Sequence, residues 1–169
     1  GVTHQILQGD GGEQGDALMP ALFSIALHPA LLRMQALMPD NVALLAYLDD
    51  IYIVCLPEDA AHCLQTARDA LREICHIDIN AGKLAAWSKT VAGCPPGMEG
   101  EDANGDSIWK ADLPAEQRGI KVLGAPLGSP EYIQKFCDDV VTEKAKLLDL
   151  IPKLPSLQAS WLLLYFCAV

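Results

Sequence analysis

The sequence predicts an α+β fold, with an antiparallel sheet backed by helices and followed by a helical C-terminal segment. Near residue 50, two short runs of β-branched and aromatic residues flank a polar pair, which is typical of a β-hairpin. Stretches with apolar residues at helical spacing stand before and after this hairpin. A chain of 169 residues that is 51% hydrophobic can also bury a core of its own.

The first half of the chain is expected to form a loop, a helix, the hairpin and a second helix. Residues 1–16 are rich in glycine and predict a loop. A helix is predicted from about Pro20; Pro29 should kink or divide it, and Pro39-Asp40-Asn41 should end it. After the hairpin, Pro57-Glu58-Asp59 supplies the acidic first turn of the second helix. The apolar stripe of that helix consists of Ala61, Leu64, Ala67, Leu71, Ile74 and Cys75.

The middle of the chain predicts short strands joined by a long loop. Ile77-Asp78-Ile79 alternates as a short strand does, and residues 120–123 predict another. Between them, residues 93–119 are rich in Gly, Pro, Asp and Glu, which favours a surface loop with a small hairpin near Trp109.

The C-terminal segment, residues 129–169, is predicted to be helical. Ser129-Pro130-Glu131 is a strong helix start, with a capping serine, proline at the first position and an acid at the second. Pro152 and Pro155 separate this helix from a final one that begins at Ser156.

The predicted hairpin holds two adjacent carboxylates, Asp49 and Asp50, within residues 46–54, which read AYLDDIYIV. The two residues are expected at the hairpin tip. Favoured two-residue turns use glycine, and this pair offers none and adds like-charge repulsion. Either aspartate serves here as a common turn former, or a divalent cation with hard oxygen ligands relieves the repulsion.

Charge and cysteine content narrow the setting. The net charge of −10 does not indicate a basic surface of the kind that binds nucleic acid. None of the six cysteines is spaced as C-x-x-C, which favours reduced thiols in an intracellular protein, and the spacing around His62-Cys63 and Cys75-His76 fits zinc poorly. No signal peptide is recognisable. The chain starts at Gly1 and stops inside the apolar run 161–169, so we expect an excerpt from a longer protein.

Four motifs in order resemble those of reverse transcriptases, most closely the non-LTR retrotransposon type. Residues 12–23, GEQGDALMPALF, resemble motif B, with the form G-x-x-Q-G-x-x-x-S-P-x-L-F. Tyr47-Leu48-Asp49-Asp50 resembles the Y-x-D-D box of motif C. Residues 77–83, IDINAGK, resemble the end of motif D, and residues 119–124, GIKVLG, resemble motif E. The order and spacing are more specific than any single motif.

The resemblance implies a partial palm domain over residues 1–128, with its antiparallel sheet backed by helices, and the start of a helical thumb over residues 129–169. It implies RNA-directed DNA synthesis with Mg²⁺, which Mn²⁺ can replace. The implied partners are an RNA template, a DNA primer and deoxynucleoside triphosphates, with no membrane. The implied location is intracellular, and nuclear for the parent element.

The resemblance also assigns roles to single residues. Asp49 would be the main catalytic metal ligand and Asp50 a lesser one, because two-metal nucleotidyl transfer needs carboxylates that hold Mg²⁺. Lys83 would lie near the triphosphate and protonate or neutralise the leaving pyrophosphate. Gln14 and Gly15 would meet the template base and the incoming nucleotide.

Three further residues are implied in substrate binding: Tyr47 would pack beneath the nascent base pair, and Leu123 and Gly124 would support the primer end. The chain departs from the family at residues 17–20, which read ALMP where many members have Pro-Leu-Ser-Pro. Motif A and the fingers are missing, since only Asp10 and Glu13 are acidic before Gln14. We therefore expect this chain alone to be inactive.

Two other interpretations remain open. One is a related polymerase, such as a group II intron maturase or an RNA-templated RNA polymerase; the acidic charge argues against a maturase, and Y-x-D-D differs from the usual G-D-D of viral RNA polymerases. The other is a degenerate or repurposed module that binds partners and catalyses nothing.

Overall fold

The computed structural model describes residues 16–90 and 93–167, which fall into two compact units. The first unit comprises residues 1–80 with 95–97, and the second comprises residues 81–94 with 98–169. Both combine helices with antiparallel strands, so the predicted α+β class is confirmed; the strands form two separate hairpins. The boundary between palm and thumb at residue 128 stays a prediction.

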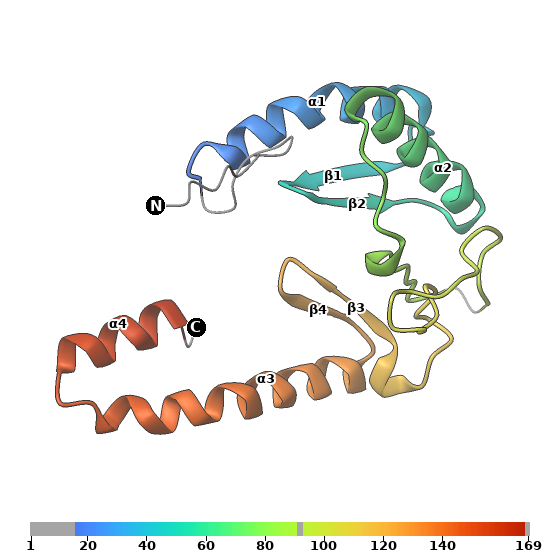
Figure 1. Cartoon of the computed structure of the whole chain (residues 1–169). Helices are drawn as coiled ribbons and strands as arrows, with labels where there is room; N and C mark the ends of the chain where they lie inside the picture. The colour runs from blue at the N-terminus through green and yellow to red at the C-terminus, as the bar shows by residue number, and fades with distance from the viewer. Residues whose placement is uncertain (1–15, 91–92, 168–169) are drawn as a thin grey trace, which may run out of the picture. The chain divides into compact units, whose positions relative to one another are not determined.

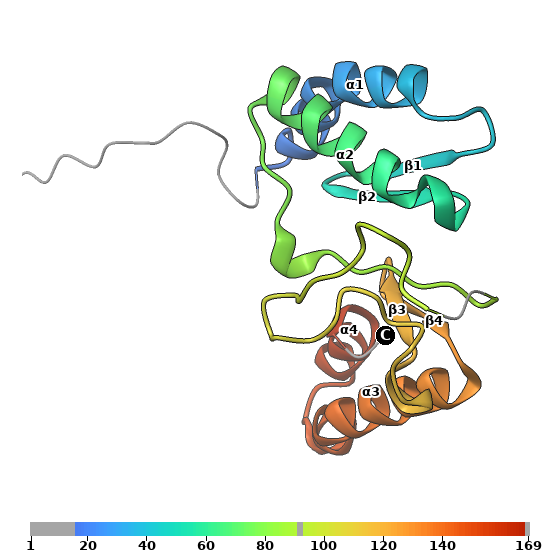
Figure 2. The same ribbon diagram turned by 90° about the vertical axis from the view of Figure 1, so that its right-hand side faces the viewer.

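The first unit packs two helices on one side of a hairpin, as both views show (Figures 1 and 2). Its elements are α1 (Met19–Leu37), β1 (Ala43–Tyr47), β2 (Asp50–Val54) and α2 (Ala60–Ala70), which runs on into a π-helical turn, Leu71–Cys75. The buried core lies between the helices; its members are Leu27, Ala30, Met34, Met38, Cys63, Ala67, Ala70 and Leu71.

The hairpin presents one face to this core and the other to solvent. Leu44, Ile51 and Ile53 pack against the helices, while Leu45, Tyr47 and Val54 are exposed, because side chains alternate along a strand. Five residue pairs set the register, from Ala43 opposite Val54 to Tyr47 opposite Asp50. The alternation seen in the sequence thus reports a half-buried sheet.

Five cysteines in the described part of the chain are free thiols: Cys55, Cys63, Cys75, Cys94 and Cys137. Burial, with a smaller effect from neighbouring Cys63, raises the pKa of Cys55 to about 11, so this thiol stays protonated at neutral pH.

The second unit combines a short hairpin with a long helix that packs against it (Figure 1). The hairpin consists of β3 (Gly119–Val122) and β4 (Ala125–Gly128), and the helices are α3 (Pro130–Leu150) and α4 (Leu157–Cys167). Gly119 and Gly128 face each other in the register, and a Cβ atom at either would collide with the ring of Tyr132 on α3. The missing side chains let the helix approach the strands.

The predicted start of α3 is confirmed. The Ser129 hydroxyl oxygen accepts a hydrogen bond from the Tyr132 N–H at 3.1 Å, and Pro130 is the first helical residue. The residue types at this boundary therefore act as the sequence indicates.

The long loop before β3 has a small core of its own. Met98, Ile108, Trp109 and Ala111 are buried, and Trp109 pairs with Ala86 in a short parallel bridge. The predicted small hairpin corresponds to a tight antiparallel turn in which Glu101 bridges Ser107.

Pro29 lies inside α1 and does not divide it, while the predicted kink stays a prediction. Another expectation about the first unit is wrong. Residues 77–79 form no strand: the Ile77 N–H bonds to the Leu71 carbonyl at 3.2 Å, Arg72 pairs with Asp78 at 2.7 Å, and Ile79 packs on the core. Alternation by itself does not make a strand, because a strand also requires a neighbouring strand with free backbone groups.

The ion pair between Lys110 and Asp102 holds the loop of the second unit. Their side chains are 14% and 12% exposed, and Nζ lies 3.0 Å from Oδ2. The hydrogen bond from Lys110, aided by the Asn104 and Asp106 N–H groups, lowers the pKa of Asp102. A lowered carboxyl pKa stabilises the folded state above the ordinary pKa near 4.

Lys110→Met is therefore expected to lower the free energy of unfolding of the second unit at pH 7. The difference from the unchanged chain should shrink as pH falls below about 4, because Asp102 is then protonated in the unfolded state and progressively in the folded state. Urea unfolding followed by the fluorescence of buried Trp109 measures this. Lys135→Met, which breaks the exposed pair with Asp139, is the control with little effect. A difference independent of pH would contradict the assignment.

Candidate functional site

The two carboxylates lie at the tip of the β1–β2 hairpin, one residue from the predicted register. The two turn residues are Leu48 and Asp49, while Asp50 is the first residue of β2 and pairs with Tyr47. The prediction that Asp49 and Asp50 together form the two-residue tip is therefore wrong in register.

The apolar pattern could not decide between these two registers. A turn at Leu48–Asp49 and a turn at Asp49–Asp50 both direct Leu44, Ile51 and Ile53 to the same face. In the observed turn Leu48 has a φ of 53°, in the left-handed region, whereas Asp49 does not have a positive φ. Two-residue hairpin turns with a positive φ at the first turn residue and a negative φ at the second prefer glycine at the first position. Leu48 occupies that position and therefore adopts a strained backbone conformation.

The carboxylates are open to solvent, and one of them has a defined partner. Tyr47, Asp49 and Asp50 are all exposed. The hydroxyl of Tyr52 donates a hydrogen bond to Oδ2 of Asp50, with 3.2 Å between the oxygens. Both side chains lie on the face of β2 that points away from the helices, because residues two apart share a face.

The donor chemistry of the tip fits a hard divalent cation. Carboxylate oxygens are the preferred protein ligands of Mg²⁺, which commonly binds one or two of them and keeps several waters or phosphate oxygens. Within residues 16–90 and 93–167, no cluster of three or more His, Cys, Asp or Glu side chains suits a metal. Asp49 and Asp50 would thus supply part of a coordination sphere.

Three predicted site residues belong to the second unit. Lys83 is exposed at the end of a 3₁₀ turn, Ala81–Lys83. Leu123 and Gly124 form the two-residue turn between β3 and β4, with φ values of 48° and 86°. Positive φ at both positions is the pattern of a type I′ turn, and Gly124 meets it without strain. The predicted strand over residues 120–123 thus ends at Val122.

Gln14 and Gly15 lie outside the described residues, so their predicted contacts stay predictions. Of the predicted site residues, the structure brings Tyr47, Asp49 and Asp50 together on one hairpin. Tyr52 is not among the site residues predicted from the sequence. Its position two residues after Asp50 on a strand nevertheless places the two side chains on one face.

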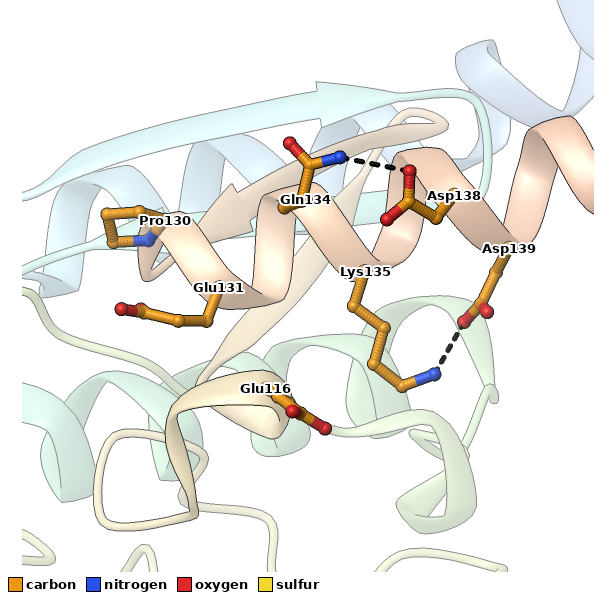
Figure 3. Close-up of a pocket in the computed structure, with 7 residues that line it drawn as sticks. All are labelled: Glu116, Pro130, Glu131, Gln134, Lys135, Asp138 and Asp139. Atoms are coloured by element: carbon orange, nitrogen blue, oxygen red, sulfur yellow. Dashed lines mark hydrogen bonds and ion pairs between the residues drawn. The ribbon is translucent and has the colours of Figure 1, made fainter.

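A surface depression in the second unit is lined by α3 and a 3₁₀ turn, Ala115–Gln117 (Figure 3). All its lining residues are exposed: Glu116, Pro130, Glu131, Gln134, Lys135, Asp138 and Asp139. Gln134 bonds to Asp138 at 2.9 Å, and Lys135 bonds to Asp139 at 2.8 Å, which raises the pKa of Lys135. Two pairs of these exposed side chains thus bond to each other along α3.

Among the described residues, no helix is long and apolar enough to cross a bilayer.

Comparison with known proteins gives one family. The model for reverse transcriptase (RNA-dependent DNA polymerase) matches residues 2–127, which include the β1–β2 tip, Lys83 and the β3–β4 turn. No curated protein and no solved structure matched the chain.

Substitutions at Leu48 should report the left-handed turn. Leu48→Asn is expected to be at least as stable as the unchanged chain, because asparagine tolerates positive φ. Leu48→Val should be less stable than Leu48→Asn by about 1 kcal/mol, because a branched Cβ crowds the left-handed backbone. Leu45→Asn and Leu45→Val, at an exposed strand position, are the matched controls and should rank in the opposite order. Urea unfolding followed by circular dichroism measures both pairs, and the same ranking at the two positions would contradict the turn.

Proposed function

The chain belongs to the reverse transcriptase (RNA-dependent DNA polymerase) family, and from this premise we propose that it is a palm segment of an RNA-directed DNA polymerase of the non-LTR retrotransposon type. Members of this family act on nucleic acids and nucleotides and use divalent metal ions. The observation that carries the proposal is the pair of exposed carboxylates at the tip of a hairpin whose other face is packed on two helices.

Asp49 and Asp50 are proposed to hold the metal, with Asp49 as the main ligand. Bound Mg²⁺ would stabilise the charge on the attacking and leaving oxygens in nucleotidyl transfer by a two-metal mechanism. The role of the chain is to fix the position of the carboxylates, and packed strands do this better than a free loop. Further ligands must come from water, substrate phosphates or another carboxylate.

Substrate contacts are proposed on both units. Lys83, a cation at an exposed turn, would neutralise or protonate the leaving pyrophosphate. Gln14 can donate to and accept from a base, and Gly15 lets the backbone approach the incoming nucleotide.

Three residues would contact the growing duplex. The exposed ring of Tyr47, next to the carboxylates, would pack beneath the nascent base pair. Leu123 and Gly124 would support the primer end, because their tight turn exposes the Gly124 backbone and the Leu123 side chain at the end of the hairpin. The proposed location of the parent protein is intracellular and nuclear, in keeping with free thiols and with a DNA product.

A non-catalytic descendant of the same family is the second candidate, and the net charge of −10 favours it. Nucleic-acid binding draws most of its non-specific affinity from Lys and Arg at phosphates. A maturase-type polymerase is less compatible with this charge.

Manganese should bind selectively at the hairpin tip. We expect Mn²⁺ to broaden the amide NMR signals of residues 47–52 at millimolar concentrations, because two carboxylates without a third give weak affinity. Asp49→Asn should abolish the broadening, whereas Asp40→Asn, the same charge change at another exposed position of the first unit, should not. Uniform broadening across the acidic residues 99–112 would contradict a specific site.

The chain alone is expected not to extend a DNA primer on an RNA template with Mg²⁺ or Mn²⁺. Its described residues place no third carboxylate with the pair, and removing one member of such a catalytic unit usually costs orders of magnitude in rate. A longer form with a third carboxylate should extend the primer, and Asp49→Ala in that form should lower the rate by about a hundredfold or more.

Two results would change this proposal. Incorporation by the chain alone that vanishes in Asp49→Ala would show that another carboxylate, Asp10 or Glu13, completes the site. A longer form that binds Mn²⁺ at the tip and extends no primer would favour the non-catalytic candidate.

A further inference from the structure

The outward face of the β1–β2 hairpin places two tyrosines beside Asp50. Tyr47 stands directly opposite Asp50 on β1, and Tyr52 follows two residues later on β2. Among the described residues, only the Tyr52 hydroxyl donates a hydrogen bond to the carboxylate, with 3.2 Å between the hydroxyl oxygen and Oδ2. The Tyr52 side chain is half-buried, whereas Tyr47 is 60% exposed.

This hydrogen bond leaves the two oxygens of Asp50 unequal. A phenol at neutral pH is an uncharged donor, so its proton occupies one lone pair of Oδ2 without adding a positive charge. Oδ1 carries no such partner among the described residues. A cation arriving at the tip therefore meets a carboxylate with one oxygen engaged and its orientation restricted.

A carboxylate that can bind through one oxygen only and a carboxylate that can bind through both oxygens favour different divalent cations. Mg²⁺ demands a near-octahedral shell with short bonds and takes carboxylates through single oxygens together with water. Ca²⁺ accepts six to eight ligands and gains from carboxylates that bind through both oxygens. A donor fixed on Oδ2 obstructs the second mode and leaves the first intact.

We propose that Tyr52 is a positioning residue that holds Asp50 as a one-oxygen ligand and thereby favours Mg²⁺ and Mn²⁺ over Ca²⁺ at the hairpin tip. The inference rests on the proposed metal-binding role of Asp49 and Asp50. It adds a residue outside the Y-x-D-D box and a selectivity that the two carboxylates do not have by themselves. Tyr52 acts through Asp50 and does not itself contact the cation.

The test is cation competition for Mn²⁺ on the full 169-residue chain at pH 7. Broadening of the residue 47–52 amide signals reports bound Mn²⁺, and titration with Ca²⁺ or Mg²⁺ alone gives the concentration of each that reverses it. In Tyr52→Phe, which keeps the ring and removes the hydroxyl, Ca²⁺ should become more effective relative to Mg²⁺ by roughly two- to tenfold, the range for one hydrogen bond.

Two further variants separate the hydroxyl from other effects. Tyr52→Leu removes the hydroxyl with a different side chain and should show the same change in the Ca²⁺ to Mg²⁺ ratio. Tyr47→Phe removes the neighbouring hydroxyl on the same face and should leave the ratio unchanged.

The outcomes distinguish this inference from the metal site itself. Local broadening with an unchanged ratio in Tyr52→Phe would overturn the role of Tyr52 and leave the metal site standing. An equal change of the Ca²⁺ to Mg²⁺ ratio in Tyr47→Phe would also overturn it. Loss of any hydroxyl on the outward face of the hairpin would then change the ratio, and the hydrogen bond to Asp50 would not be the cause. Absence of local broadening in the unchanged chain would overturn the metal site and this inference together.

Discussion

The candidate site depends on the packing of one hairpin face against two helices. A two-stranded hairpin by itself is marginally stable in water, so β1 and β2 need the apolar contacts that Leu44, Ile51 and Ile53 make with the core around Met34 and Cys63. Those contacts hold the hairpin against the helices and leave its other face, with Asp50, directed to solvent. The turn at Leu48 and Asp49 then sets which residues form the tip.

Because side chains alternate along the strands, one face of the hairpin packs on the core and the other carries the residues of the candidate site. Each residue that turns toward the helices leaves its neighbours directed outward, and on β2 those outward positions are Asp50, Tyr52 and Val54. Leu48 belongs to the same turn and is strained, because it occupies the position where this turn favours glycine. Backbone strain beside a charged pair is common at functional sites.

Much of the fold could be predicted from local rules, and the failures share one cause. The cap at Ser129 and the hairpin itself follow from interactions within a few residues, so the sequence displays them. The exact turn and the status of residues 77–79 depend on which backbone groups pair, which periodicity does not reveal. At the site, the Y-x-D-D motif identifies Asp49 and Asp50, whereas Tyr52 is recognised as their neighbour only from the observed strand register. Lys83, Leu123 and Gly124 occupy the other unit, and Gln14 and Gly15 lie outside the described residues.

The distribution of aromatic residues gives the hairpin its own spectroscopic signature. Trp87, Trp109 and Trp161 all belong to the second unit, while Tyr47 and Tyr52 flank the carboxylates of the first. A luminescent lanthanide ion bound at the tip would lie on the strand face that also carries the phenol rings of Tyr47 and Tyr52. Energy absorbed by those rings would pass to the ion, and the emission would arise at the hairpin with no label attached to the chain.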